Sequence, residues 1–94
     1  MAQTNPVSVT VSMDTIDLRN AQTTPVRGPD HVDNLQGLLK AAARNDAKFD
    51  PGQIDGIGGA RTKQAVGNFQ AAKGLQQDFI VGVNTWRTLI QHRP

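Results

Sequence analysis

The sequence predicts a mainly α fold: a compact three-helix bundle with short loop strands, preceded by an N-terminal extended or β arm. Three observations support this prediction: three segments with apolar residues at helical spacing, a loop motif that occurs twice, and alternating apolar and polar residues near the N-terminus. A chain of 94 residues is long enough for one small domain. We expect the arm to cover 1–29, with a candidate strand at 7–18, and the helical domain to cover 30–94.

The candidate strand is predicted from apolar residues at every second position between Val7 and Met13. A period of two is typical of a strand that buries one face. The phase slips near Asp14, because Ile16 is the next apolar residue, and such a slip indicates a turn or a bulge. The segment that follows, up to Pro29, is rich in turn-forming residues and is predicted to be a loop.

The first predicted helix begins at Asp30, a residue type favoured as an N-cap, and ends near Arg44. Its apolar residues recur at helical spacing and form one stripe: Val32, Leu35, Leu38, Leu39 and Ala42. A loop rich in Asp, Pro and Gly is expected over 46–59, with Phe49 as its candidate anchor.

Two further helices are predicted, over about 60–73 and about 83–91. Apolar residues at helical spacing support both, and Trp86 belongs to the buried face of the third helix. Gly74 stands where a glycine commonly ends a helix, and the apolar run 79–81 predicts a brief strand. Helices this short are marginal alone, so we expect all three to pack around one core.

The loop motif repeats at a constant offset. Both copies read Asp-x-Ile-x-Gly-x-x-Thr, from Asp55 to Thr62 and from Asp78 to Thr85, with an apolar residue four positions after each Thr. Such a repeat indicates one supersecondary unit used twice, a tight loop that opens a helix. The Gly suits a sharp turn and the Asp can accept hydrogen bonds from loop N–H groups. Taken singly, each of these residues is explained by a structural role.

Composition excludes several classes of function. The chain has no Cys, its acidic residues are all Asp, and its ten cations are scattered without a run, which argues against a nucleic-acid partner. No apolar stretch approaches the roughly 20 residues of a membrane span. No signal peptide is visible, so we expect the chain to be cytoplasmic as synthesised.

No catalytic or metal-binding constellation is evident. His31 and His92 are far apart in the sequence and neither has a second ligand at metal-site spacing. Asp50 and Asp55 lie in a Gly-rich loop that is expected to be too open to tune a catalytic pKa. We therefore predict no catalysis, no metal and no cofactor.

Three blocks of residues, in order and at matching spacing, carry a resemblance to a known family. They begin at Val32, Asp55 and Gly74, and read Val-x-x-Leu-Gln-x-Leu-Leu, Asp-Gly-Ile-x-Gly-x-x-Thr-x-x-Ala-Val-x-x-Phe-Gln and Gly-Leu-x-x-Asp-x-Ile-Val-Gly-x-x-Thr-Trp-x-x-Leu. This pattern closely resembles the peptidoglycan-binding domain family, a three-helix module often attached to bacterial cell-wall hydrolases and transpeptidases. The resemblance covers residues 32–90 and leaves 1–30 uncovered.

The chain departs from the family pattern in its loops. It has Gly58 where the family usually has an aromatic residue, and Ala60 and Val83 where the family usually has Pro. It has Phe79 where the family prefers Gly, which is costly if that position needs a positive φ. Gly58 is expected either to open a pocket or to loosen the core.

The resemblance implies a non-catalytic module that binds peptidoglycan in a shallow groove formed by the two repeated loops and the adjoining helix faces. Arg61 is the most attractive residue, because a guanidinium can hold a stem-peptide carboxylate with two hydrogen bonds. Gln36 and Gln70 also match the family, and we interpret them as packing residues or as hydrogen-bonding loops to helices. Carried over position by position, the candidate binding residues are Asp55, Gly56, Arg61, Thr62, Asp78, Asn84 and Thr85.

The sequence is consistent with two functions. One is a free-standing binder of peptidoglycan glycan or stem peptide, a phage or bacterial accessory protein that acts at the cell wall after release or within a virion. The other is a structural or assembly component, such as a virion tail or capsid-surface protein. In that role strand 7–18 pairs with a protein partner or with a second copy. A strand of this length is expected to have little to pair with inside a helical bundle, and an unpaired strand edge is a template for another chain.

Overall fold

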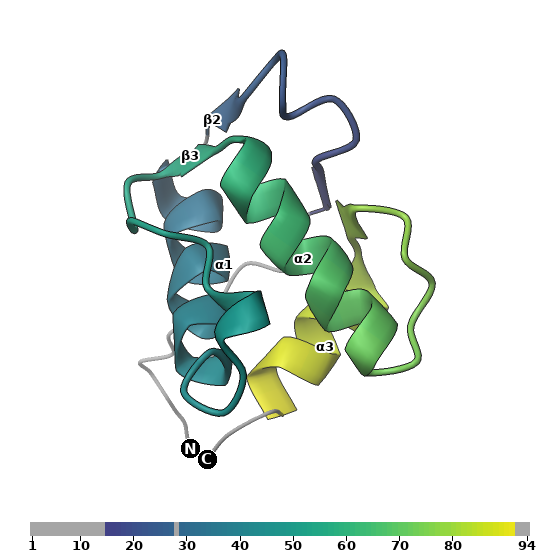
Figure 1. Cartoon of the computed structure of the whole chain (residues 1–94). Coiled ribbons are helices and arrows are strands. Elements are labelled where there is room, and N and C mark those ends of the chain that lie inside the picture. The colour runs from purple at the N-terminus through teal and green to yellow at the C-terminus, as the bar shows by residue number, and fades with distance from the viewer. Residues whose placement is uncertain (1–14, 28, 92–94) are drawn as a thin grey trace, which may run out of the picture.

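Three helices and two small sheets make up the computed structural model, which describes residues 15–27 and 29–91. The helices are α1 (Pro29–Ala42), α2 (Ala60–Ala72) and α3 (Val83–Gln91), and a short 3₁₀ helix, η1 (Ala47–Phe49), lies between α1 and α2 (Figure 1). The strands are β1 (Ile16–Asp17), β2 (Val26–Arg27), β3 (Ile57–Gly58) and β4 (Ile80–Val81). The predicted mainly α fold is confirmed.

The helices bury the faces that their sequence patterns predict. Fully buried side chains of α1, α2 and α3 meet in one core, with Trp86 and Phe69 as its largest members. Phe49 is buried as the predicted anchor of the loop, and its ring packs edge to face on Phe69 with 5.4 Å between centroids. Gly74 ends α2 at φ 72°, as expected for a left-handed glycine at a helix end.

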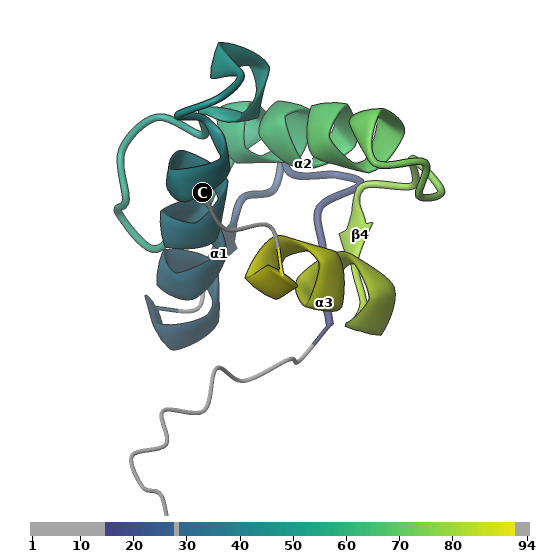
Figure 2. The same ribbon diagram turned by 90° about the horizontal axis from the view of Figure 1, so that it is seen from below.

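The segment before α1 belongs to the same core. β1 pairs antiparallel with β4, and β2 pairs antiparallel with β3. Ile16, Leu18 and Ala21 are buried, and Figure 2 shows this segment running along α2 toward β4. The described residues on the N-terminal side of the predicted boundary at residue 29 thus contribute to the helical core, because they close its open side.

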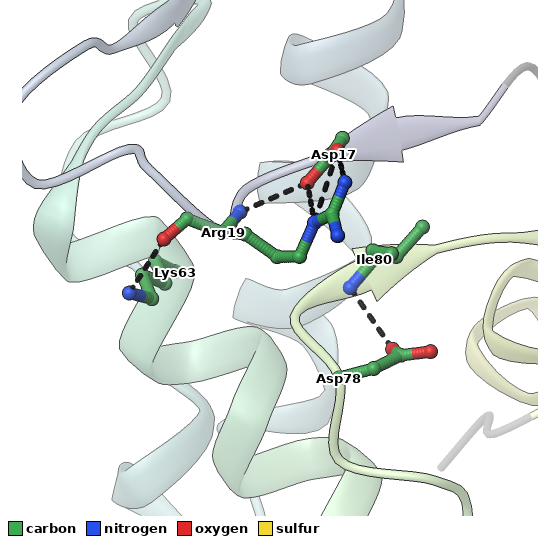
Figure 3. Close-up of polar contacts among 5 residues, drawn as sticks. All are labelled: Asp17, Arg19, Lys63, Asp78 and Ile80. Carbon is green, nitrogen blue, oxygen red and sulfur yellow. Dashed lines mark hydrogen bonds and ion pairs between the residues drawn. The ribbon is translucent and has the colours of Figure 1, made fainter.

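The candidate strand 7–18 is described only from residue 15 onward, and its residues 7–14 lie outside the described part. Ile16 pairs with Val81 and Asp17 pairs with Ile80, so the expectation that this strand has little to pair with inside the bundle is wrong for these two residues. Lys63 Nζ of α2 donates to the carbonyl oxygen of Arg19 at 2.9 Å, which fixes the chain just after β1 (Figure 3).

Leu18 fills the space that Gly58 leaves free. A Cβ built on Gly58 would lie 2.9 Å from Leu18 Cδ2 and 3.6 Å from Val26 Cβ, and Leu18 is fully buried. Because both contacts come from the segment before α1, this segment supplies the apolar bulk that position 58 lacks. Gly58 therefore neither opens a pocket nor loosens the core at this point.

Phe79 adopts the positive φ that its position requires. Its φ is 60°, which a glycine adopts without strain and a phenylalanine does not. Its ring lies against Gly67 in the middle of α2, where an added Cβ would collide with the ring edge, and Lys63 Nζ lies 4.9 Å from the ring centroid. The packing against Gly67 and the cation–π contact offset the strain.

Replacing Gly67 with alanine is expected to lower the free energy of unfolding by about 1–3 kcal/mol, because the new methyl group overpacks against the Phe79 ring. Urea denaturation of the purified variant measures this change. Gly37→Ala is the matched control in α1, where a Cβ meets nothing within 4 Å, and it should raise stability by up to about 1 kcal/mol. The prediction is contradicted if Gly67→Ala stabilises as Gly37→Ala does.

Candidate functional site

A buried glutamine of α1 holds the first repeated loop. Gln36 is 1% exposed, and its Oε1 accepts hydrogen bonds from the backbone N–H groups of Asp55 (3.0 Å) and Gly56 (3.1 Å). Its Nε2 lies 3.1 Å from each of three acceptors: Asp55 Oδ1, the Ile57 carbonyl oxygen and Thr62 Oγ1. One carboxamide therefore fixes both ends of the loop to α1, an arrangement that we call the glutamine clamp.

The second loop has the same clamp, supplied by Gln70 of α2. Gln70 Oε1 accepts from the N–H of Phe79 at 3.0 Å. Its Nε2 donates to Asp78 Oδ1 (3.0 Å), to the Ile80 carbonyl oxygen (3.0 Å) and to Thr85 Oγ1 (3.2 Å). The interpretation of both glutamines as residues that hydrogen-bond loops to helices is confirmed, and the repeat extends from sequence to three-dimensional hydrogen bonding.

Two aspartates beside the first loop, Asp50 and Asp55, have lowered pKa values. The Ile57 N–H, and after it the Gln36 amide, hold the pKa of Asp55 below its ordinary value. The Gly52 N–H, and after it Lys40 at 3.2 Å, lower the pKa of Asp50. A general acid or base that works near neutral pH needs a raised carboxyl pKa. The local hydrogen bonds instead lower the pKa of both carboxyl groups.

Three shallow hollows open beside these loops. The first loop hollow, of about 290 Å³, is lined by residues 51–53, by Gln36 and by the first repeat from Asp55 to Thr62. The second loop hollow, of about 220 Å³, is lined by Leu75, Gln76 and the second repeat from Asp78 to Thr85. The α2 hollow, of about 580 Å³, lies between η1 and α2 and shares Ala60 and Arg61 with the first loop hollow.

The structure places most of the candidate binding residues around the two loop hollows. Asp55, Arg61 and Thr62 line the first, whereas Asp78, Asn84 and Thr85 line the second. Thr62 and Thr85 are 2% and 5% exposed, and both accept a hydrogen bond from a clamp glutamine, so they shape the floors of the hollows. Gly56 is buried and donates its N–H to Gln36, at φ 74°.

Arg61 is exposed at the start of α2, where it borders two hollows. Its side chain passes over Gly52: a Cβ added there would lie 3.2 Å from Arg61 Cδ, and Gly52 itself has φ 87°. Lys48 and Asp50 line the α2 hollow beside Arg61, and Asp50 is already paired with Lys40. The guanidinium also lies near enough to Asp50 to help lower the pKa of its carboxyl, after the larger effects of the Gly52 N–H and Lys40. Its exposed side chain borders both the first loop hollow and the α2 hollow.

Over residues 15–27 and 29–91, no three His, Cys, Asp or Glu side chains gather closely enough to hold a metal ion. No helix in those ranges is both long and apolar enough to cross a membrane.

A family model supports the resemblance that the sequence pattern indicates. The model described as "Putative peptidoglycan binding domain" matches residues 29–89. The match contains α1, α2, both repeats and both clamp glutamines, and it contains α3 except for its last two residues. β1 and β2 lie before the match. No curated protein matches the chain at a significant level. Because the family model covers well over half of the sequence, the chain belongs to the peptidoglycan binding domain family.

Proposed function

We propose that this chain binds the glycan or stem peptide of bacterial peptidoglycan as a free-standing module, and that it does not cleave it. The observation that carries the proposal is the pair of loop hollows, each open to solvent and each built on a glutamine clamp. Open hollows with carboxylate, amide and guanidinium groups in their lining suit a polymer that offers hydroxyl, amide and carboxylate groups. Membership of the family supports the same ligand.

The proposed contacts divide the candidate residues into two groups. Arg61 holds a carboxylate, because its planar guanidinium offers paired donors. Asp55, Asp78 and Asn84 present oxygen atoms to hydroxyl and amide groups at the hollows. The other three candidates do not contact the ligand directly and instead hold the loops in shape through hydrogen bonds to the clamp glutamines: Gly56, Thr62 and Thr85.

The absence of catalysis is also part of the proposal. Both loop hollows are shallow and open to solvent, and the pKa of Asp55 in the first is lowered by the hydrogen bonds that its carboxylate accepts. Hydrolysis of a glycan commonly needs a second carboxyl group with a raised pKa. We therefore expect the purified chain to release no soluble fragments from cell walls.

The site of action that we propose is the cell wall, reached after release from the cell or as part of a virion of a phage. The alternative function, assembly through strand 7–18 with a protein partner or a second copy, depends on residues 7–14, which lie outside the described residues. β4 pairs with Ile16 and Asp17 in a sheet of two strands, so these two residues already have a strand partner within the chain. Wall binding is therefore the function that the described residues support better.

Purified protein is expected to sediment with insoluble peptidoglycan sacculi, and Arg61→Ala should weaken retention by about five- to tenfold, as expected for a charge-assisted contact. The fraction in the pellet, measured against sacculus concentration, gives the affinity. Arg87→Ala is the matched control, because Arg87 is also an exposed helix arginine but lines none of the three hollows. Folded wild-type protein that stays in the supernatant would contradict the proposal.

A further inference from the structure

The two loop hollows are built from the same positions of the repeat. In each, the lining includes the Asp, the Ile, the Gly, the first two helical residues and the Thr, from Asp55 to Thr62 in the first and from Asp78 to Thr85 in the second. Each Asp also accepts a hydrogen bond from the N–H two residues later, Ile57 at 2.9 Å and Ile80 at 3.0 Å. The hollows are thus structural equivalents.

The two hollows differ in charge at one equivalent position. Position two of the helix is Arg61 in the first hollow and Asn84 in the second. The first lining therefore contains one cation and one carboxylate, Asp55, whereas Asp78 is the charged member of the second lining. Asp55 and Asp78 repel a ligand carboxylate alike, so the difference between the hollows is the attraction by Arg61, which the second hollow lacks.

A nearby arginine does not alter this contrast. Arg19 comes close enough to Asp78 for the carboxylate to raise the pKa of its guanidinium, after the larger effect of Asp17. Figure 3 shows the Arg19 side chain turned to Asp17, which it binds through Nη2 at 2.7 Å and through Nε at 3.0 and 3.2 Å. Its charge is therefore neutralised by Asp17, and Arg19 is not part of the hollow lining.

Both hollows have apolar residues in their lining, but at one equivalent position the apolar side chain is larger in the second hollow. Leu75, Ile80 and Val83 line it, and Val83 is 52% exposed at its edge. The equivalent of Val83 in the first hollow is the smaller Ala60. An uncharged amide with a methyl group would find acceptor oxygens on Asp78 and Asn84 and an apolar contact on Val83.

We propose that the hollows bind different groups of one ligand: the first takes a carboxylate, and the second takes an uncharged amide that carries a small apolar group. This inference rests on the proposed function, because peptidoglycan offers both groups, as stem-peptide carboxylates and as acetamido or alanyl amides. The chain then binds its polymer at two places. Amidation of the stem-peptide carboxylates weakens binding in the first hollow and leaves binding in the second unchanged.

The test uses two soluble probes, a disaccharide-peptide fragment with free carboxylates and the same fragment with its carboxylates amidated. Titration of the ¹⁵N-labelled full chain, followed by amide chemical shifts, reports each hollow separately. The free acid should shift signals of both loops. The amidated fragment should shift those of 78–85 and spare those of 52–62, with affinity about five- to tenfold weaker.

Two exchanges between the copies sharpen the test. Arg61→Asn gives the first hollow the side chain of the second, and should abolish the preference for the free acid. Asn84→Arg gives the second hollow a cation, and should raise that preference by about five- to tenfold while making the shifts of 78–85 depend on the carboxylate. Arg87→Asn, which changes charge outside the hollows, should leave the preference unchanged.

The outcomes separate this inference from the proposed function. If wild-type protein sediments with sacculi but neither exchange changes the ratio of affinities for the free-acid and the amidated fragment, the assignment of different groups to the two hollows is wrong. The proposal of wall binding is then unaffected. The same holds if the amidated fragment still shifts 52–62. If the folded wild-type chain binds neither sacculi nor either fragment, the proposed function is wrong and this inference falls with it.

Discussion

Replacement of Gln36 by alanine is expected to lower the free energy of unfolding by about 3–5 kcal/mol. The side chain is fully buried, and its loss leaves the Gly56 N–H and Thr62 Oγ1 without their partner beneath the loop. Each buried polar group that loses its partner costs about 1–3 kcal/mol, and the vacated volume adds to this cost. Such a loss is a large share of the 5–15 kcal/mol that commonly stabilises a domain.

Urea unfolding of Gln36→Ala measures this cost. Gln64→Ala is the control, because Gln64 is an exposed residue of α2 and its replacement should change stability by less than about 0.5 kcal/mol. Gln70→Ala removes the second clamp and should cost a similar amount to Gln36→Ala. A cost below 1 kcal/mol for both clamp variants would show that water replaces the amide, and would contradict a structural role for the clamp.

Replacement of Leu18 by alanine should lower the free energy of unfolding by about 2–5 kcal/mol, the usual range for a buried leucine. Leu18 is 0% exposed, lies in the core and fills the space beside Gly58. Its backbone N–H also donates to the Phe79 carbonyl oxygen at 2.9 Å, so the side chain has little freedom to move away. The measurement is thermal or urea unfolding of the full chain.

A double-mutant cycle with Gly58→Ala identifies the contact. In the wild type, Gly58→Ala should destabilise, because the new Cβ meets Leu18 Cδ2 at 2.9 Å. In the Leu18→Ala background the methyl group has room, so the same change should cost less or stabilise. Additive effects would mean that Leu18 does not contact position 58 in solution. A cost below 0.5 kcal/mol for Leu18→Ala would mean that residues 16–21 contribute little to the core.

Much of the fold is predictable from the sequence because helical periodicity is a strong signal. The apolar stripe of α1, the glycine at the end of α2 and the bounds of α3 follow from it, with α1 beginning one residue earlier and ending two residues earlier than predicted. The docking of 16–27 was not predictable in the same way. Strands of two residues have no period to detect, and the partner of Leu18 is a glycine, which gives no apolar signal.

Part of the site was predictable from the sequence, because its repeated residues stand at a constant offset. The constant offset of the repeat brings out Asp55 with Asp78 and Thr62 with Thr85. It does not bring out the clamp, because Gln36 lies on α1 and Gln70 lies on α2, at different distances from their loops. The hydrogen bonds that define the equivalence of the two glutamines become visible only when the helices are placed in space.

The glutamine clamp has a consequence for how this scaffold changes over evolution or by engineering. The groups that shape each loop are backbone amides, an Asp, a Thr and a buried Gln, whereas the first two helical residues project from the shaped loop toward solvent. Substitutions at 60, 61, 83 and 84 therefore leave the loop's internal hydrogen bonds intact. Ligand preference can therefore change at these positions without loss of the fold, so they form a small variable surface on a fixed frame.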